Sequence, residues 1–150
     1  MGNRMSHIKN SMKQIEQEVG LIICSSKIYE SSPWGKTNQK HFLNSVIKVE
    51  TKLAPSNVLE KLQIIEKKLG RIRKEKWRER IIDLDILFFN SEIINTKKLK
   101  IPHPYIQNRR FVLVPLSEIN SDYTHPILQR NILSLLKKCN DTKKVEEYAI

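Results

Sequence analysis

The chain has 150 residues, 39% of them hydrophobic and 29% charged, a composition that is typical of globular proteins and excludes a disordered chain. No apolar run approaches the ~18 residues of a membrane span, and the first residues do not form a signal peptide, so we expect a cytoplasmic protein without a membrane partner. Two cysteines are too few for a disulfide framework. Lys and Arg number 27 against 16 Asp and Glu, a net charge of +11 that favours an anionic partner.

Hydrophobic spacing predicts the following elements in chain order. Helices are expected at residues 6–19, 55–70 and 127–138, and strands at residues 21–29, 42–49 and 81–89. Residues 109–116 are apolar enough for a buried helix or strand, and their periodicity favours neither. The order helix, two strands, helix, strand belongs to a βαββαβ pattern. We therefore expect one α+β domain over residues 1–150, an antiparallel sheet, and a first strand that this chain lacks.

Single residues predict three local features. Gly20 is expected to take the left-handed conformation that ends the first helix. Asn90–Ser91 is expected to form a turn that leads into a short strand near Ile93. On the last helix, the inward-facing side chains are expected to be Leu128, Ile132, Leu135 and Leu136.

The strongest candidates for chemistry are Asp83 and Asp85, which lie in the third expected strand. Residues two apart on a strand point to the same side, ~6.6 Å apart along its axis, so the two carboxylates converge. Such a pair favours Mg²⁺, which binds one or two carboxylates together with substrate phosphates. The alternative is a pair of surface aspartates that neighbouring arginines neutralise.

A strongly basic segment directly precedes this strand, because residues 67–80 carry eight Lys or Arg side chains and only two acidic ones. Guanidinium groups match phosphate geometry with paired donors, so a basic arm beside a carboxylate pair suits phosphoryl transfer. The chain has no glycine-rich phosphate loop, which excludes P-loop enzymes and protein kinases. A solvated charged loop and a nucleic-acid patch are the alternatives for this arm.

Two further groups of residues fit a nucleotide and a flat heterocycle. His103 stands between two prolines with Arg109 downstream, and both side chains offer donors to phosphate. Phe42 and Asn44 share a strand face, so a heterocycle would stack on the ring and pair with the amide. Read singly, His103 is a capping or surface histidine, and the aromatic side chains are ordinary core packing.

The motifs are Leu69-Gly70-Arg71-Ile72-Arg73, Lys76-Trp77, Arg80-Ile81-Ile82-Asp83-Leu84-Asp85-Ile86-Leu87, Ile101-Pro102-His103-Pro104, Asn108-Arg109 and Phe111-Val112-Leu113-Val114-Pro115-Leu116. In order and spacing they resemble one family, the 6-hydroxymethyl-7,8-dihydropterin pyrophosphokinases of folate biosynthesis. The resemblance extends from about residue 2 to about residue 126.

The resemblance implies a ferredoxin-like α+β fold and transfer of pyrophosphate from MgATP to the hydroxymethyl oxygen of the dihydropterin, with release of AMP. It implies two Mg²⁺ ions held by Asp83 and Asp85, which act in catalysis together with Arg71 and Arg80. The implied nucleotide positions are Gln63, Glu66, Arg73, Lys76, Trp77, Ile86, His103 and Arg109. The implied pterin positions are Ser31, Ser32, Trp34, Phe42, Asn44 and Phe111.

The sequence departs from the family pattern in three places. Lys76 replaces the usual Arg before Trp77, so it keeps the charge and loses the fork. Arg78-Glu79 stands where the family tends to have Gly-Pro. At the start only Gly2-Asn3-Arg4 remains of the first strand and its glycine-rich turn, and we expect the natural start to lie upstream.

Two other readings remain open from the sequence. The charge of +11 would suit a non-enzymatic RNA-binding domain of similar topology, although the Asp83–Asp85 pair would repel phosphates. The absent first strand would suit an inactive remnant. We favour the enzyme, expect ATP and the pterin rather than nucleic acid as partners, and expect a monomer.

Overall fold

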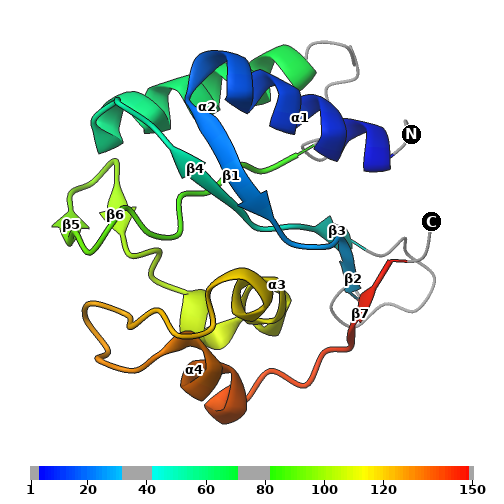
Figure 1. The fold of residues 1–150 in the computed structure, drawn as a ribbon, viewed down its shortest axis with the longest axis vertical. Coiled ribbons are helices and arrows are strands. Elements are labelled where there is room, and N and C mark those ends of the chain that lie inside the picture. Colours follow the sequence, from blue (N-terminus) through cyan, green and yellow to red (C-terminus); the bar gives the residue numbers. More distant parts are fainter. Residues whose placement is uncertain (1–3, 32–41, 71–81, 149–150) are drawn as a thin grey trace. The chain divides into compact units, whose positions relative to one another are not determined.

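A computed structural model of the chain describes residues 4–31, 42–70 and 82–148 (Figure 1). The chain divides into two compact units, and two of the three boundaries between them fall within strands. Unit 1 comprises residues 1–23 and 48–86, and unit 2 comprises residues 24–47 and 87–150. None of the helices in the described ranges is long and apolar enough to cross a membrane.

Unit 1 is built on two amphipathic helices, α1 (Arg4–Glu18) and α2 (Pro55–Gly70), that contact each other. Pro55 suits the first helical position because its missing N–H would have no partner there. Apolar residues recur every three or four positions, which gathers them on one face of each helix. The buried hydrophobic residues described in this unit are Ile8, Ile15 and Val19 from the first helix and its end, and Val58, Leu62, Ile65 and Leu69 from the second.

Gly20 follows α1, and a glycine is required there because the neighbouring backbone leaves no room for a side chain. Its φ lies outside the left-handed region, so the expected left-handed conformation is wrong. A Cβ atom at this position would lie 3.0 Å from Thr51 Cα and still closer to the Glu50 carbonyl group. The same approach lets the Thr51 hydroxyl donate to the Val19 carbonyl oxygen at 2.6 Å, which satisfies the end of the helix.

Unit 2 has a core between α3 (Arg110–Asn120) and α4 (Ile132–Lys138). Periodicity left residues 109–116 open between helix and strand, and the structure shows a helix, α3. The buried cluster of this unit is Ile106, Leu113, Leu116, Ile132 and Leu135.

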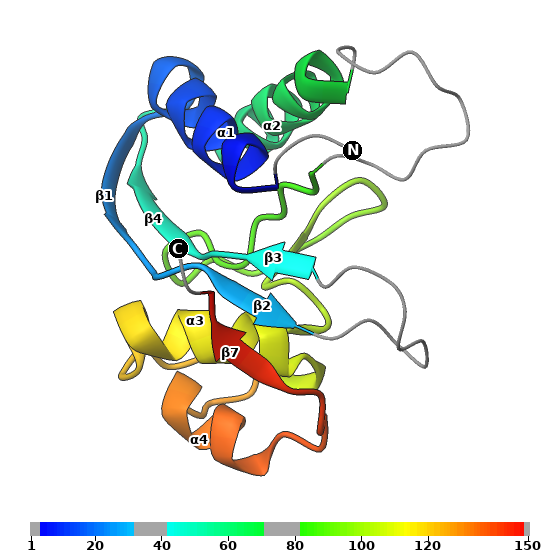
Figure 2. The ribbon, with the colours of Figure 1, turned by 90° about the vertical axis from the view of Figure 1, so that its right-hand side faces the viewer.

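A three-stranded antiparallel sheet lies against α3 (Figure 2). Its order is β3 (Phe42–Asn44), β2 (Tyr29–Ser31) and β7 (Val145–Glu147), so β2 is central. The remaining strands form two pairs, β1 (Leu21–Ser25) with β4 (Ile47–Glu50), and β5 (Ile94–Asn95) with β6 (Lys100–Ile101). The turn after Asn90 and a short strand at Ile94 agree with the sequence prediction.

The expected strands 21–29 and 42–49 are each interrupted in the structure. The Ser26 N–H donates to the Val46 carbonyl at 2.8 Å, and the Val46 N–H donates to the Ser26 hydroxyl at 2.9 Å. The Lys27 N–H turns to a carboxylate of α3 instead of a neighbouring strand. Because side chains replace ladder partners here, β1 separates from β2, and β3 separates from β4.

The prediction of a strand at 81–89 is wrong for the described residues 82–88, which belong to none of the sheets. The expected alternation is nevertheless present, with Asp83 and Asp85 exposed and Ile82, Leu84 and Ile86 half-buried. Two backbone groups of this segment form hydrogen bonds with partners that are not strands. The Leu84 N–H donates to a side chain of α2, and the Leu87 carbonyl accepts the His103 N–H.

The last helix begins later than predicted, at Ile132 instead of residue 127. The Asn131 side chain caps it by accepting the Ser134 N–H at 2.8 Å. Before the cap, His125 Nδ1 accepts the N–H groups of residues 127 and 128, which holds them in a turn. Leu128 is therefore 37% exposed instead of facing the core. Strand β7 was not predicted, because its sequence lacks an apolar alternation.

Gly20→Ala should lower the free energy of unfolding by about 1–3 kcal/mol, because the new methyl group meets fixed backbone. Gly70→Ala is the matched control, since a Cβ there meets no described atom within 4 Å and alanine favours helix by up to ~1 kcal/mol. Urea unfolding of both variants measures the difference. Equal stability of the two proteins would contradict the steric role of Gly20.

Candidate functional site

The structure describes eleven of the eighteen residues that the sequence proposes for the site. In unit 1 these are Gln63, Glu66, Asp83, Asp85 and Ile86. In unit 2 they are Ser31, Phe42, Asn44, His103, Arg109 and Phe111. The remaining seven, Ser32, Trp34, Arg71, Arg73, Lys76, Trp77 and Arg80, lie outside the described residues.

In unit 1 the two aspartates flank Leu84, a residue whose backbone N–H is fixed by a side chain of α2. Glu66, half-buried on α2, accepts the Leu84 N–H with its Oε2 atom at 2.7 Å. A carboxylate acceptor makes this a charge-assisted hydrogen bond, stronger than one between neutral groups. Leu84 is thereby held between Asp83 and Asp85, both of which are exposed. The backbone between the two exposed carboxylates is therefore fixed by a side chain of α2.

These carboxylates fit a magnesium ion that also binds substrate. Within residues 4–31, 42–70 and 82–148, no group of three or more His, Cys, Asp or Glu side chains is arranged to hold a metal. A complete protein cage is therefore not present in those ranges. Mg²⁺ keeps several waters and takes one or two carboxylates plus phosphate oxygens, so two exposed aspartates suffice for a substrate-bound ion. Sequence reasoning placed Glu66 at a nucleotide, and the structure gives it a backbone contact.

In unit 2 four side chains form a continuous set of ring contacts, which we call the aromatic–basic cluster: His103, Tyr105, Arg109 and Phe111. The His103 and Tyr105 ring centroids lie 5.9 Å apart. The Arg109 guanidinium carbon lies 5.2 Å from the Tyr105 centroid and 5.7 Å from the Phe111 centroid, within cation–π range. The structure thus brings three predicted site residues together around a tyrosine.

Tyr105 was missed by the sequence analysis. It is 53% exposed, unusual for a large aromatic side chain, and it directly follows the Pro102–Pro104 motif. An aromatic residue next to a rigid proline-rich turn is the signal that could have found it. Its own N–H donates to His103 Nδ1 at 3.2 Å, so a neutral His103 carries its proton on Nε2. Nε2 is then the donor nitrogen of this ring.

The other predicted residues of unit 2 lie on the pair β2–β3. Ser31 stands opposite Phe42, and Tyr29 stands opposite Asn44 in the antiparallel register. Phe42 and Asn44 are two residues apart and so share a face, as the sequence predicts. Ser31 is buried, whereas Phe42 is 51% exposed, which is high for an apolar ring. This strand pair offers an open aromatic surface with an amide beside it.

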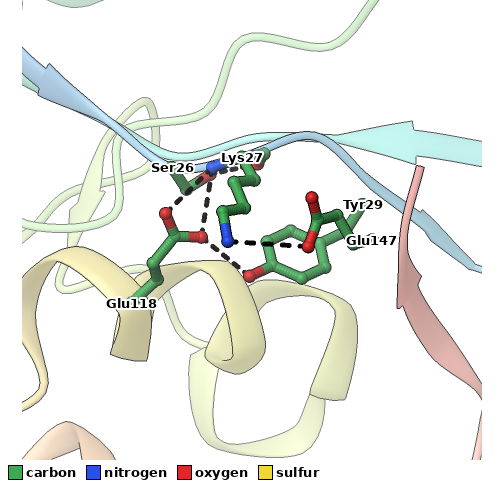
Figure 3. A network of polar contacts seen from close by, with 5 residues as sticks. All are labelled: Ser26, Lys27, Tyr29, Glu118 and Glu147. Atoms are coloured by element: carbon green, nitrogen blue, oxygen red, sulfur yellow. Dashed lines mark hydrogen bonds and ion pairs between the residues drawn. The ribbon is translucent and has the colours of Figure 1, made fainter. Parts of the chain in front are cut away.

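A carboxylate of α3 holds the start of β2 in place (Figure 3). Both Glu118 oxygens accept the Lys27 N–H at 3.1 Å, and Oε1 also accepts the Tyr29 hydroxyl at 2.7 Å. Lys27 Nζ lies 3.6 Å from a Glu147 oxygen of β7. The strand that ends at Ser31 is therefore tied to the helix that begins beside Arg109.

Burial raises the pKa of Tyr29 to about 12, with the hydrogen bond to Glu118 and the charges of Glu118 and Glu147 as the further causes. A folded-state pKa above the ordinary value of 10 means that the folded protein favours the protonated phenol. Its contribution to stability is complete below about pH 10 and is lost as the pH rises toward about 12.

Comparison with solved structures defines the fold class. The chain superposes on the structure titled Plasmodium falciparum HPPK-DHPS with a TM-score of 0.74, at 20% identity, over 92% of this chain and 42% of that longer one. A second structure, titled HPPK-DHPS in complex with substrates, gives a TM-score of 0.73. The mixed helices and antiparallel strands described above therefore form a ferredoxin-like α+β fold.

Sequence comparison gives the family. The model of the 7,8-dihydro-6-hydroxymethylpterin-pyrophosphokinase (HPPK) family matches residues 1–121. A 2-amino-4-hydroxy-6-hydroxymethyldihydropteridine pyrophosphokinase of Aquifex aeolicus is 41% identical over 87% of this chain and 81% of its own length. The Haemophilus influenzae protein of the same name is 43% identical over 83% and 78% of the two chains. The chain belongs to the HPPK family.

Glu118→Gln should lower the pKa of Tyr29 from about 12 while leaving it above 10, because the charge disappears and the burial remains. The tyrosinate absorbance, followed against pH in the wild type and the variant, measures this shift. Tyr29→Phe identifies which of the four tyrosine transitions belongs to this residue. An unchanged high-pH transition in Glu118→Gln would contradict the role given to the carboxylate.

Proposed function

We propose that this chain transfers pyrophosphate from MgATP to the hydroxymethyl group of 6-hydroxymethyl-7,8-dihydropterin, releasing AMP, as a step of folate biosynthesis. Membership of the HPPK family is the observation that carries the proposal. The exposed aspartate pair and the aromatic–basic cluster support it, because they supply oxygen ligands for a metal nucleotide and surfaces for a flat ring. The proposal treats residues 1–150 as one functional domain.

The proposed reaction forms one bond to phosphorus and breaks another. The hydroxymethyl oxygen attacks the β-phosphorus of ATP, and the bond between this phosphorus and the oxygen bridging to the α-phosphate breaks. AMP leaves with that oxygen, and the hydroxyl proton passes to solvent. Catalysis of such a transfer depends mainly on positioning and on stabilising charge at the phosphate oxygens.

In unit 1, Asp83 and Asp85 would hold two Mg²⁺ ions, which supply neutralising charge at the phosphates when bound. Glu66 keeps the intervening peptide fixed through the Leu84 N–H. Exposed Gln63 on α2 and half-buried Ile86 would contact the nucleotide. The fixed backbone matters because two like charges must be held together before the cations arrive.

In unit 2, the pterin would stack on Phe42 and Phe111 and pair its polar edge with Asn44, beside Ser31. An exposed ring next to an amide suits a flat heterocycle that carries both donors and acceptors. Arg109 and the Nε2 donor of His103 would bind phosphate oxygens. Tyr105 joins this proposal because its ring lies against the Arg109 guanidinium.

The residues outside the described ranges keep their proposed roles on the family resemblance alone. Arg71 and Arg80 would stabilise charge on the transferring group, and Arg73, Lys76 and Trp77 would bind the nucleotide. Ser32 and Trp34 would contact the pterin. No comparison favours an RNA-binding domain, and the proposed enzyme acts as a monomer on two small substrates.

Release of AMP from ATP and Mg²⁺, measured with and without the pterin, tests the function directly. We expect AMP only when the pterin is present. Pterin-dependent AMP formation that persists in excess EDTA would contradict a requirement for a divalent metal. Absence of AMP under all conditions, together with salt-sensitive RNA binding, would favour the non-enzymatic alternative.

Asp85→Asn should lower kcat by ~10²-fold or more, because the neutral amide is a poorer ligand for a hard cation and the metal supplies several kcal/mol of charge stabilisation. The free energy of unfolding should change by less than ~0.5 kcal/mol, because Asp85 is exposed. Asp122→Asn makes the same charge change at an exposed position of unit 2 and should leave kcat unchanged. Near-normal kcat in Asp85→Asn would overturn the metal assignment.

A further inference from the structure

We propose that the C-terminal segment Asp141–Tyr148 positions the pterin-binding residues of unit 2, with Asp141 as the positioning residue. This inference rests on the function proposed above. The segment lies beyond residues 1–121, the range that the family model matches. Its two ends contact the two elements that carry the pterin residues, α3 and the strand pair β2–β3.

At one end of the segment, Asp141 fixes the first peptide of α3. Its Oδ2 atom accepts the Arg110 N–H at 3.0 Å, and its Oδ1 atom accepts the Lys143 N–H at 3.0 Å. Arg110 is the residue between Arg109 and Phe111. The peptide bonded to Asp141 therefore links Arg109 to Arg110, and Phe111 is the next residue along the chain.

Asp141 supplies a cap that the helix itself lacks. The first N–H groups of a helix have no partner within the helix, and a side chain at the preceding position usually accepts one of them. Here the preceding residue is Arg109, which makes no side-chain capping bond. An arginine cannot accept a hydrogen bond, so the acceptor comes from 31 residues further along the chain. The negative carboxylate also interacts favourably with the helix dipole.

Because Asp141 accepts the Arg110 N–H, the Arg109 side chain is not needed as a cap and makes other contacts. Its guanidinium lies over the rings of Tyr105 and Phe111. If the first turn of α3 frayed, the Arg109 and Phe111 side chains would sample more orientations, and the pterin would have to order them on binding. The expected consequence is weaker pterin binding with little change in the chemical step.

At the other end, β7 completes the sheet that presents Phe42 and Asn44. Tyr29 pairs with Glu147 and Ser31 pairs with Val145 across the β2–β7 ladder, and the Tyr148 N–H donates to the Ile28 carbonyl at 2.8 Å. Strand β2 therefore has a partner on each edge. Without β7, β2 would become an edge strand held only by β3 and by Glu118.

The test compares three full-length variants by pterin fluorescence titration, by the AMP assay and by amide hydrogen exchange at Arg110. Asp141→Ala removes both acceptor oxygens. Asp141→Asn keeps one acceptor oxygen and serves as the conservative variant. Glu146→Ala removes the same charge from the same segment, where the side chain forms an exposed ion pair with Lys144 at 2.8 Å. Such exposed pairs contribute little to stability.

We expect Asp141→Ala to raise the pterin dissociation constant and KM about fivefold and to speed Arg110 exchange, with kcat within about twofold of the wild type. Asp141→Asn should fall between Asp141→Ala and the wild type, and Glu146→Ala should match the wild type. If Asp141→Ala fails to fold, pterin binding and Arg110 exchange are compared between Asp141→Asn and Glu146→Ala instead.

Faster Arg110 exchange with unchanged pterin binding would overturn the positioning role, and unchanged exchange would overturn the contact itself. A loss of pterin affinity as large in Glu146→Ala as in Asp141→Ala would assign the effect to charge and overturn the role of the cap. A third outcome separates the two proposals. If Asp141→Ala weakens pterin binding but the wild-type protein forms no AMP, the proposed reaction is overturned and the positioning role stands.

Discussion

A backbone N–H that leaves a regular hydrogen-bond ladder must find another acceptor, and among the described residues carboxylates supply that acceptor beside three parts of the candidate site. Glu66 accepts the Leu84 N–H, Glu118 accepts the Lys27 N–H, and Asp141 accepts the Arg110 N–H. The Leu84 and Arg110 contacts are partly buried, where an unpaired peptide group would cost about 1–3 kcal/mol, whereas the Lys27 contact is exposed to solvent. The loops that carry the candidate site depend on these three contacts.

Each carboxylate lies beside residues to which we assign chemistry. Leu84 separates the two aspartates of the proposed metal site, and Arg110 separates Arg109 from Phe111. Lys27 leads into the strand that ends at Ser31. Asp83 and Asp85 are exposed and Arg109 and Phe111 are half-buried, and the backbone beside these residues is fixed, which lowers the entropy that substrates must remove on binding.

Sequence patterns predicted the features that depend on neighbours along the chain. The helix Pro55–Gly70 was predicted with its bounds, since apolar spacing and a proline at its start are local signals. The alternation around Asp83 and Asp85 was predicted for the same reason. The strand at 81–89, the uninterrupted strands at 21–29 and 42–49, and the early start of the last helix were not found. Ser26, Glu118 and His125 bond to backbone groups there, across as many as 91 positions of sequence.

The sequence by itself determined the family of this protein and suggested the chemistry that we propose for it, because the identity and spacing of the aspartates, histidine and arginines are written along the chain. The tertiary structure alone decided that Tyr105 joins His103 and Arg109 and that a carboxylate near the C-terminus caps α3. It also decided that β7 pairs with β2. The physical reason is that the Asp141 cap and the β7–β2 ladder join residues far apart in the sequence, and such contacts leave no periodic signal. The contacts of Tyr105 are local, but they depend on ring orientations that hydrophobic periodicity does not report.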